Sequence, residues 1–180
     1  FDDSGAVSRM VGSIEDITDS ETDPMTGAIM RAAGTERIEQ ILKSDPEAGS
    51  VHAFMIADLD NFKNLNDRLG HMWGDHALHD VVKIIRDNCR AQDVICRLGG
   101  DEFVVFFRDI PLDVLQERVK LLSEQLHITY ENEGETVTIS VSMGIALTEK
   151  GKVTFQELYK RADKGLYEVK RTKKGTWHIV

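Results

Sequence analysis

The sequence is poor in cysteine, in proline and in long apolar runs. It has two cysteines and three prolines in 180 residues. The spacing of Cys89 and Cys96 fits neither a zinc motif nor a disulfide framework, so we expect two inert thiols in a reducing compartment. No apolar run approaches the roughly 18 residues of a membrane span, and there is no signal peptide. These absences predict a cytoplasmic chain without direct membrane insertion.

Positive charge is also scarce. The chain has 22 basic and 31 acidic residues, for a net charge of −9, which argues against non-specific binding to nucleic acid or anionic lipid. A phosphorylated ligand would need local lysines or metal ions. Hydrophobic residues make up 41% of the chain, enough for one buried core at this length. Because the sequence starts with Phe1, we expect a fragment of a larger protein.

Apolar periodicity and turn residues predict an N-terminal extension over residues 1–22, with a strand at 6–14, and one domain over 23–180. Helices are predicted over 28–43, 62–69, from Asp75 onward, 111–126 and 154–171. Strands are predicted over 51–57, 94–98, 103–107, 128–131, 136–147 and 177–180. The fold class is therefore α+β, with a central, mostly antiparallel sheet flanked by helices.

Two connections attract attention. Residues 70–74 are expected to be a loop, with Asp75 as the N-cap of the next helix. Residues 99–102, Gly-Gly-Asp-Glu, are expected to be a four-residue hairpin connection whose glycines permit positive φ and the close approach of a ligand.

Three carboxylates, Asp58, Asp60 and Asp101, lie at strand ends or in this tight turn. If the two strands are neighbours, Asp58 and Asp101 converge, and two acidic ligands completed by phosphates are a common way to hold magnesium. Each acid taken alone is better explained as a solvated turn residue, because acids are common in turns. The two glycines followed by two acids, opposite a second acidic strand end, favour a site.

Residues 97–103, Arg-Leu-Gly-Gly-Asp-Glu-Phe, resemble the signature of GGDEF domains, the diguanylate cyclases. The resemblance extends in order from residue 23 to the C-terminus, through the segments 23–27, 58–75, 142–146 and 162–167. It implies a palm-like nucleotide-cyclase fold. It also implies that two GTP condense to cyclic di-GMP and two pyrophosphates, across a homodimer of GTP-loaded domains.

The resemblance further implies the residues that hold the metal. Its ligands would be the carboxylates of Asp58 and Asp101 and the carbonyl of Leu59, with Mg²⁺ or Mn²⁺ as the ion and two ions per active half-site. Asp101 and Glu102 would be catalytic, with Glu102 assisting at the metals or as a base. An exposed glutamate at a strand entry is the alternative for Glu102.

Guanine selection would fall to Asn66 and Asp75, because a carboxylate that accepts the N1 and N2 protons of guanine meets an acceptor at N1 of adenine. A turn residue and a plain helix N-cap are the alternatives. Phe62 and Lys63 would border the triphosphate of GTP, and Lys170 and Lys174 would bind its phosphates. Gly99 and Gly100 would let the backbone approach the nucleotide closely. Lys174 replaces a family arginine and binds phosphate only as a point charge. A solvated basic tail is the alternative for both C-terminal lysines.

Arg90 and Asp93 resemble the family's RxxD inhibitory site, with five residues between Asp93 and Gly99. Arginine can grip phosphate and stack on guanine, so product would bind here, with Arg118 as a second phosphate contact. A surface ion pair is the alternative.

Two other functions remain open. A non-catalytic module that senses cyclic di-GMP or GTP is disfavoured because Asp101 and Glu102 are present. A cyclase that makes a 3′,5′-cyclic mononucleotide is compatible with Asn66 and Asp75. Residues 12–18 weakly resemble the end of a PAS domain, which implies a sensor-linked parent, and an ordinary extension is the alternative. Met30 departs from the family, which has asparagine at this position.

Overall fold

The computed structural model describes residues 21–44, 51–148 and 153–180. The predicted strand over 6–14 and the PAS-like segment lie outside these residues. Within the described ranges, no helix is both long and apolar enough to cross a membrane.

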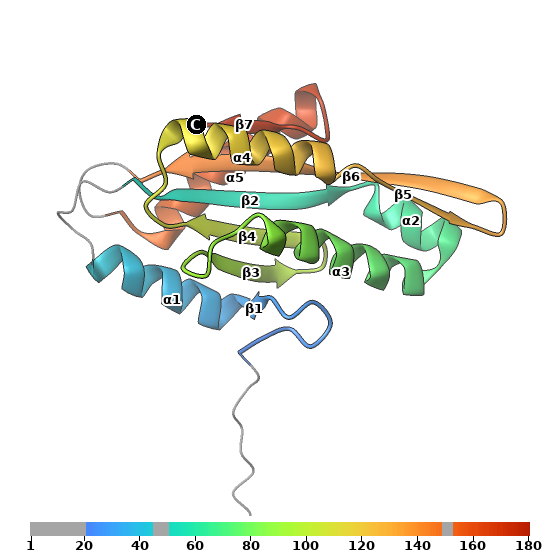
Figure 1. The fold of residues 1–180 in the computed structure, drawn as a ribbon, viewed down its shortest axis with the longest axis horizontal. Coiled ribbons are helices and arrows are strands. Elements are labelled where there is room, and N and C mark those ends of the chain that lie inside the picture. The colour runs from blue at the N-terminus through green and yellow to red at the C-terminus, as the bar shows by residue number, and fades with distance from the viewer. Residues whose placement is uncertain (1–20, 45–50, 149–152) are drawn as a thin grey trace, which may run out of the picture.

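A seven-stranded sheet forms the centre of the domain, in the order β1-β3-β4-β2-β6-β5, with β7 also paired to β6 (Figure 1). The pairs β1 with β3 and β6 with β7 are parallel, and the other pairs are antiparallel. The prediction of a mostly antiparallel sheet is therefore confirmed. The strands are β1 Ile29–Met30, β2 Ala53–Asp60, β3 Val94–Gly99, β4 Glu102–Phe107, β5 Ile128–Asn132, β6 Glu135–Leu147 and β7 Trp177–Ile179.

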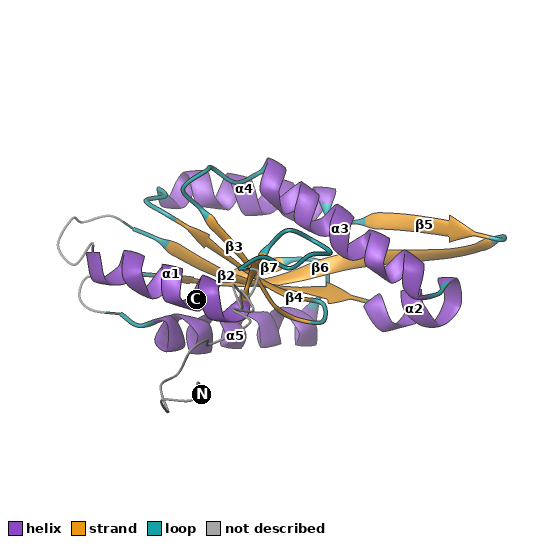
Figure 2. Cartoon of the chain, turned by 90° about the horizontal axis from the view of Figure 1, so that it is seen from below, coloured by secondary structure: helices purple, strands orange, loops and turns teal. Residues whose placement is uncertain are grey.

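Helices cover both faces of the sheet. Figure 2 shows α1 and α5 on one face and α3 and α4 on the other. The short α2 follows β2 at the end of the sheet from which the β5–β6 hairpin projects (Figure 1). The helices are α1 Arg31–Ser44, α2 Phe62–Leu69, α3 His71–Asp87, α4 Leu112–Gln125 and α5 Phe155–Thr172.

Strand β2 is apolar on both faces because it lies between β4 and β6 in the middle of the sheet. Successive side chains of a strand point to opposite faces. Met55 and Ala57 accordingly belong to the core under α3 and α4, and Phe54 and Ile56 to the core under α1 and α5. Strand β2 is therefore held between two cores, and Asp58 and Asp60 lie at its C-terminal end.

The observed strand β2 is longer than predicted. It continues to Asp60, because Asp58 pairs with Glu102 of β4 and Asp60 pairs with Ser140 of β6. The acids thus belong to the strand itself. The connection between β3 and β4 is correspondingly only Gly100 and Asp101, two residues rather than four.

Two predicted helix starts are wrong. The first helix begins at Arg31, since Ile29–Met30 pairs with β3 as a short strand. The predicted loop over 70–74 is helical from His71 onward, with Gly70 as the N-cap of α3, so Asp75 lies inside the helix and is not its cap. A side chain at Gly74 would collide with Asn66 of α2, which explains a glycine within the helix.

Candidate active site

The carboxyl end of β2 and the β3–β4 turn meet at one place. Asp58 lies opposite Glu102 in the β2–β4 ladder. The backbone N–H of Leu59 donates to the carbonyl of Asp101 over 3.3 Å. Two acidic segments that are more than 40 residues apart in the sequence are thereby side by side.

These segments line a surface pocket of about 520 Å³. Acids line it from β2, α2 and the β3–β4 turn, and lysines line it from α2, α5 and the segment after α5. A pocket with both signs of charge suits a phosphorylated ligand and a cation together. The predicted site residues along its wall are Asp58, Leu59, Phe62, Lys63, Asp101, Lys170 and Lys174.

Asp58 makes an ion pair with Lys170 in this pocket. Lys170 Nζ lies 2.7 Å from Asp58 Oδ1, and the Asp58 side chain is 21% exposed. Burial raises the pKa of Asp58, and the nearby Asp101 and Asp60 add to the rise, although Lys170 opposes it. The neighbouring acids therefore disfavour the ionised form of Asp58, and a cation beside Asp58, such as the ammonium of Lys170, reduces this repulsion.

The donors around Asp58 fit a hard divalent cation. Carboxylate and carbonyl oxygens are the ligands that Mg²⁺ and Mn²⁺ take. Asp58, Asp101 and Leu59, which carry such oxygens, all line the pocket. The ammonium of Lys170 on Asp58 shows that this oxygen accepts a cation. Across the described residues, no three His, Cys, Asp or Glu side chains form a group able to hold a metal. A metal here would need carbonyl and ligand oxygens as well.

Glu102 lies beside the pocket without lining it. It is half-buried at the start of β4, and the hydroxyl of Tyr159 from α5 donates to its Oε1 over 3.3 Å. Burial raises the pKa of Glu102, and the Tyr159 hydrogen bond opposes the rise. Glu102 is therefore not a freely exposed strand-entry residue.

Asp60 differs from the other acids. Its side chain is buried, with 6% of the residue exposed. Its Oδ2 accepts from the hydroxyls of Ser140 and Ser142, over 3.0 and 2.6 Å, and from the N–H of Gly175 over 3.0 Å. Sequence reasoning placed Asp60 with the other acids and could not find these partners.

The predicted guanine residues lie outside this pocket, on the α2–α3 corner. Asn66 is half-buried against Gly74, and Asp75 is exposed on α3 directly after Gly74. Gly99 and Gly100 also lie outside the pocket lining. Their φ angles are +150° and +54°, and a Cβ on either would have no neighbour within 4 Å. The turn therefore presents open backbone.

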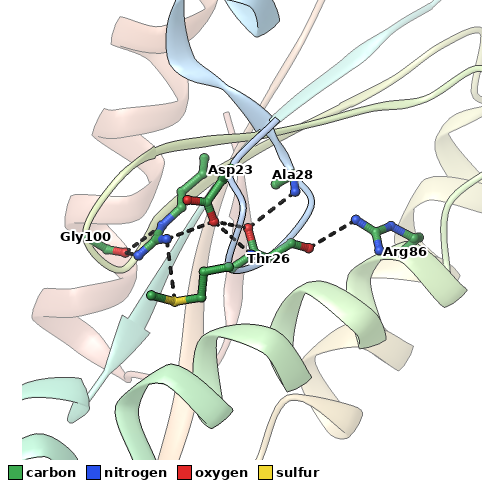
Figure 3. Close-up of polar contacts among 7 residues, drawn as sticks. Asp23, Thr26, Ala28, Arg86 and Gly100 are labelled. Atoms are coloured by element: carbon green, nitrogen blue, oxygen red, sulfur yellow. Dashed lines mark hydrogen bonds and ion pairs between the residues drawn. The ribbon is translucent and has the colours of Figure 1, made fainter. Parts of the chain in front are cut away.

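Arg97 is a residue to which sequence reasoning gave no role. Its guanidinium donates twice to the carbonyl of Gly100, over 3.1 and 2.7 Å, and once to Asp23 Oδ2 over 2.9 Å (Figure 3). Hydrogen bonds from Thr26 and Arg97 lower the pKa of Asp23, against the opposing effect of burial. Arg97 thus links the turn that contains Asp23 and Thr26 to the β3–β4 turn that carries Asp101.

The predicted inhibitory residues also come together. Asp93 Oδ2 accepts from the N–H of Arg90 over 2.7 Å, and Oδ1 accepts from the N–H of Arg108 over 3.0 Å. Arg118 Nη1 lies 3.5 Å from Asp93 Oδ2, and the Asp93 side chain is 1% exposed. Arg90 and Arg118 line one surface pocket of about 430 Å³. Asp93 therefore faces its own chain, whereas Arg90 faces solvent.

The structure is thus an α+β domain in which an acidic strand end lies beside a glycine turn, with lysines along the same pocket. The family model described as "Diguanylate cyclase, GGDEF domain" matches residues 20–176. The chain belongs to this family, as the sequence resemblance implies. The PAS-like resemblance of the N-terminus is not confirmed.

Curated relatives agree with this assignment. The chain is 34% identical over 152 residues to the response regulator PleD of Caulobacter vibrioides, covering 83% of this chain and 34% of PleD. It is 34% identical over 151 residues to the diguanylate cyclase DgcP of Pseudomonas aeruginosa, covering 83% of this chain and 22% of DgcP. The chain thus spans about a third or less of the length of these relatives.

Solved structures show the same fold. The GGDEF domain of TpbB (YfiN) from Pseudomonas aeruginosa superposes with a TM-score of 0.80 at 31% identity, covering 88% of this chain and 93% of that one. The coiled coil and GGDEF domain of DgcB from Caulobacter crescentus, in complex with c-di-GMP, gives a TM-score of 0.82 at 23% identity. That match covers 90% of this chain and 86% of that one.

Proposed function

We propose that this domain is a diguanylate cyclase, which condenses two GTP into cyclic di-GMP and releases two pyrophosphates. The observation that carries the proposal is the pocket in which Asp58 and Asp101 face Lys170 and Lys174. Relatives that are named diguanylate cyclases support it.

In this proposal Asp58, Asp101 and the carbonyl of Leu59 hold Mg²⁺ or Mn²⁺, two ions per active half-site. Bound there, the metal supplies charge that polarises the α-phosphate and acidifies the 3′-hydroxyl. Lys170 and Lys174 hold the negative charge of the triphosphate. Glu102, which bonds to Tyr159, either supports the metals or takes the proton of the 3′-hydroxyl.

The remaining contacts position the nucleotide. Phe62 and Lys63 border the triphosphate in the pocket. Asn66 and Asp75 read the guanine edge from the α2–α3 corner, where Asp75 is exposed to a ligand. The open backbone at Gly99 and Gly100 allows the nucleotide to approach closely.

The product itself tests the proposal. The chain is incubated with GTP and Mg²⁺, and the products are separated by chromatography. Cyclic di-GMP and pyrophosphate are expected. A 3′,5′-cyclic mononucleotide would instead support the intramolecular cyclase, and unconsumed GTP would support a binding module. The binding module is not favoured, because Asp101 lines the pocket and Glu102 lies beside it.

Catalysis is proposed to require two chains. One pocket that holds one GTP cannot close a two-fold symmetric product, so two loaded domains must face each other. The specific activity should therefore rise with protein concentration. A constant activity per chain, in a preparation shown to be monomeric, would contradict this requirement.

Cyclic di-GMP is also proposed as an inhibitor that binds at Arg90, Asp93 and Arg118, away from the metal-binding acids. The arginines grip its phosphates and stack on its guanines. Asp93 would offer its carboxylate to guanine, although it also accepts bonds from Arg90 and Arg108 in this structure.

A further inference from the structure

Three donors from two parts of the chain converge on one oxygen of Asp60. Ser140 and Ser142 come from β6, and Gly175 comes from the connection between α5 and β7. Hydrogen bonds to a charged acceptor are roughly twice as strong as neutral ones. Asp60 is therefore a strong anchor for whatever carries these donors.

Gly175 is held by hydrogen bonds at both its N–H and its carbonyl. Its N–H donates to Asp60 Oδ2 over 3.0 Å and shares a longer contact of 3.2 Å with the Ser142 hydroxyl. Its carbonyl accepts from the Ser123 hydroxyl of α4 over 3.1 Å. At a φ of +70°, a Cβ here would lie 2.8 Å from His127 Cε1, so the backbone fits closely among its neighbours.

Lys174 directly precedes this fixed glycine. Helix α5 ends at Thr172 and β7 begins at Trp177, so the connection that carries Lys174 is short. Lys174 is exposed and lines the pocket with Asp58 and Asp101. The place of its ammonium group therefore depends on where Gly175 is held.

We propose that Asp60 is a positioning residue, which holds Gly175 so that Lys174 faces the triphosphate. Asp60 also lines the pocket, but only 6% of the residue is exposed and its Oδ2 accepts three hydrogen bonds, so we assign it to the support of Gly175 rather than to the metal. The inference rests on the proposed function, since it names a support for the phosphate-binding side of the same pocket.

Binding experiments separate this role from the alternatives. The dissociation constants of a non-hydrolysable GTP analogue and of Mn²⁺ are measured by calorimetry for the whole chain, together with thermal unfolding. The variants are Asp60→Ala, Asp60→Asn, Lys174→Ala and the double variant Asp60→Ala with Lys174→Ala. Ser140→Ala is the matched control, because it removes a donor to Asp60 that makes no hydrogen bond to Gly175, and it keeps the Ser140 Cβ that packs beside Gly175.

Asp60→Ala should weaken the binding of the analogue about tenfold, similar to Lys174→Ala, and the double variant should be no weaker than either single variant. Asp60→Asn should restore affinity to within about threefold of the unsubstituted chain, because an amide oxygen accepts the same donors. Its Mn²⁺ affinity should stay unchanged. Ser140→Ala should change the affinity for the analogue by less than about twofold.

Other results would overturn the inference. Losses that multiply in the double variant would show that Asp60 acts independently of Lys174. Asp58→Asn is measured as the reference for a lost metal ligand. If the Asp60→Asn variant bound Mn²⁺ as poorly as this reference, Asp60 would be a metal ligand. If Asp60→Ala does not fold, Ser123→Ala decides. Ser123→Ala removes the hydrogen bond to the carbonyl of Gly175 and should weaken the binding of the GTP analogue about threefold. Unchanged binding would refute the inference.

A failure of the proposed function looks different. If the unsubstituted chain bound no GTP analogue, the proposed function and this inference would both fall. If the unsubstituted chain binds the analogue and Asp60→Ala binds it equally well, only the role of Asp60 falls.

Discussion

Two acids of this domain, each beside a basic side chain, behave in opposite ways. Asp58 is 21% exposed in its pocket and pairs with Lys170, and burial raises its pKa. Asp93 is 1% exposed, and both of its oxygens accept backbone N–H groups. An acid whose charge is poorly compensated at a pocket attracts a cation, whereas an acid whose oxygens already accept N–H groups of its own chain first stabilises the local fold and would meet a ligand in addition to these bonds.

The largest effect is expected at the pocket. Asp58→Asn and Asp101→Asn should each lower turnover by at least about a thousandfold, since metal-assisted stabilisation of the transition state amounts to several kcal/mol. The free energy of unfolding of Asp58→Asn should stay equal or rise. Burial disfavours the ionised form of Asp58, so a neutral amide removes an unfavourable charge.

Turnover is measured by product chromatography and stability by urea unfolding. Asp113→Asn, an exposed acid in the first turn of α4, serves as the control and should behave like the unsubstituted chain. Turnover retained in either pocket variant would remove the metal assignment. A loss of stability in Asp58→Asn would erase the contrast with Asp93.

The second effect concerns the saturated acid. Asp93→Ala should lower the free energy of unfolding by about 2 kcal/mol, because it removes the charged acceptor of the N–H groups of Arg90 and Arg108, and it should also weaken the binding of cyclic di-GMP. Arg90→Ala should leave stability unchanged but weaken the binding of cyclic di-GMP about thirtyfold, through the loss of a charged phosphate contact.

Calorimetry with cyclic di-GMP and urea unfolding decide between these roles. Cyclic di-GMP that binds both variants as tightly as the unsubstituted chain would show that the inhibitory site is misassigned. An Asp93→Ala variant of undiminished stability would show that its internal hydrogen bonds do not hold the turn.

A third, smaller effect is expected at the exposed α2–α3 corner. Asp75→Ala should weaken GTP binding about tenfold and reduce the preference for GTP over ATP, because it removes the acceptor for guanine N1 and N2. Stability should be unchanged, since Asp75 is exposed and does not cap the helix. Competition binding with both nucleotides measures the preference, and an unaltered ratio would count against the guanine role.

Local sequence signals predicted much of the fold. The helices predicted over 62–69 and 154–171 match α2 and α5 to within a residue, because amphipathic periodicity is a local feature. The start of α3 was missed, because two glycines four residues apart, Gly70 and Gly74, indicate a loop. Gly74 lies inside the helix instead, where a side chain would collide with Asn66.

The site was predictable only in part. The sheet brings Asp58 and Asp101 to one pocket, as neighbouring strands require, while the roles of these residues remain predictions. The contacts of Asp60 and Arg97 could not be predicted. Their partners Gly175 and Asp23 are 115 and 74 residues away, and nothing in the local pattern marks such pairs.

The smallest effect uses Cys89 as a reporter of the region around Asp93. Burial raises the pKa of Cys89 to about 12, the charge of Asp93 adds to the rise, and Arg118 opposes it. Only about one thiol in ten thousand is then ionised at pH 8. Alkylation of Cys89 by iodoacetamide should be slow at pH 8 and rise about tenfold per pH unit up to pH 10.

Asp93→Ala should speed this alkylation several-fold at a given pH, because it removes a negative charge that disfavours the thiolate. Peptide mass spectrometry follows the reaction, and Cys96, which is 0% exposed, should stay unmodified in the folded chain. A plateau of the Cys89 rate below pH 9 would mean an ordinary, solvated thiol. The turn around Asp93 would then be as open as the pocket around Asp58, and the contrast between the two acids would fail.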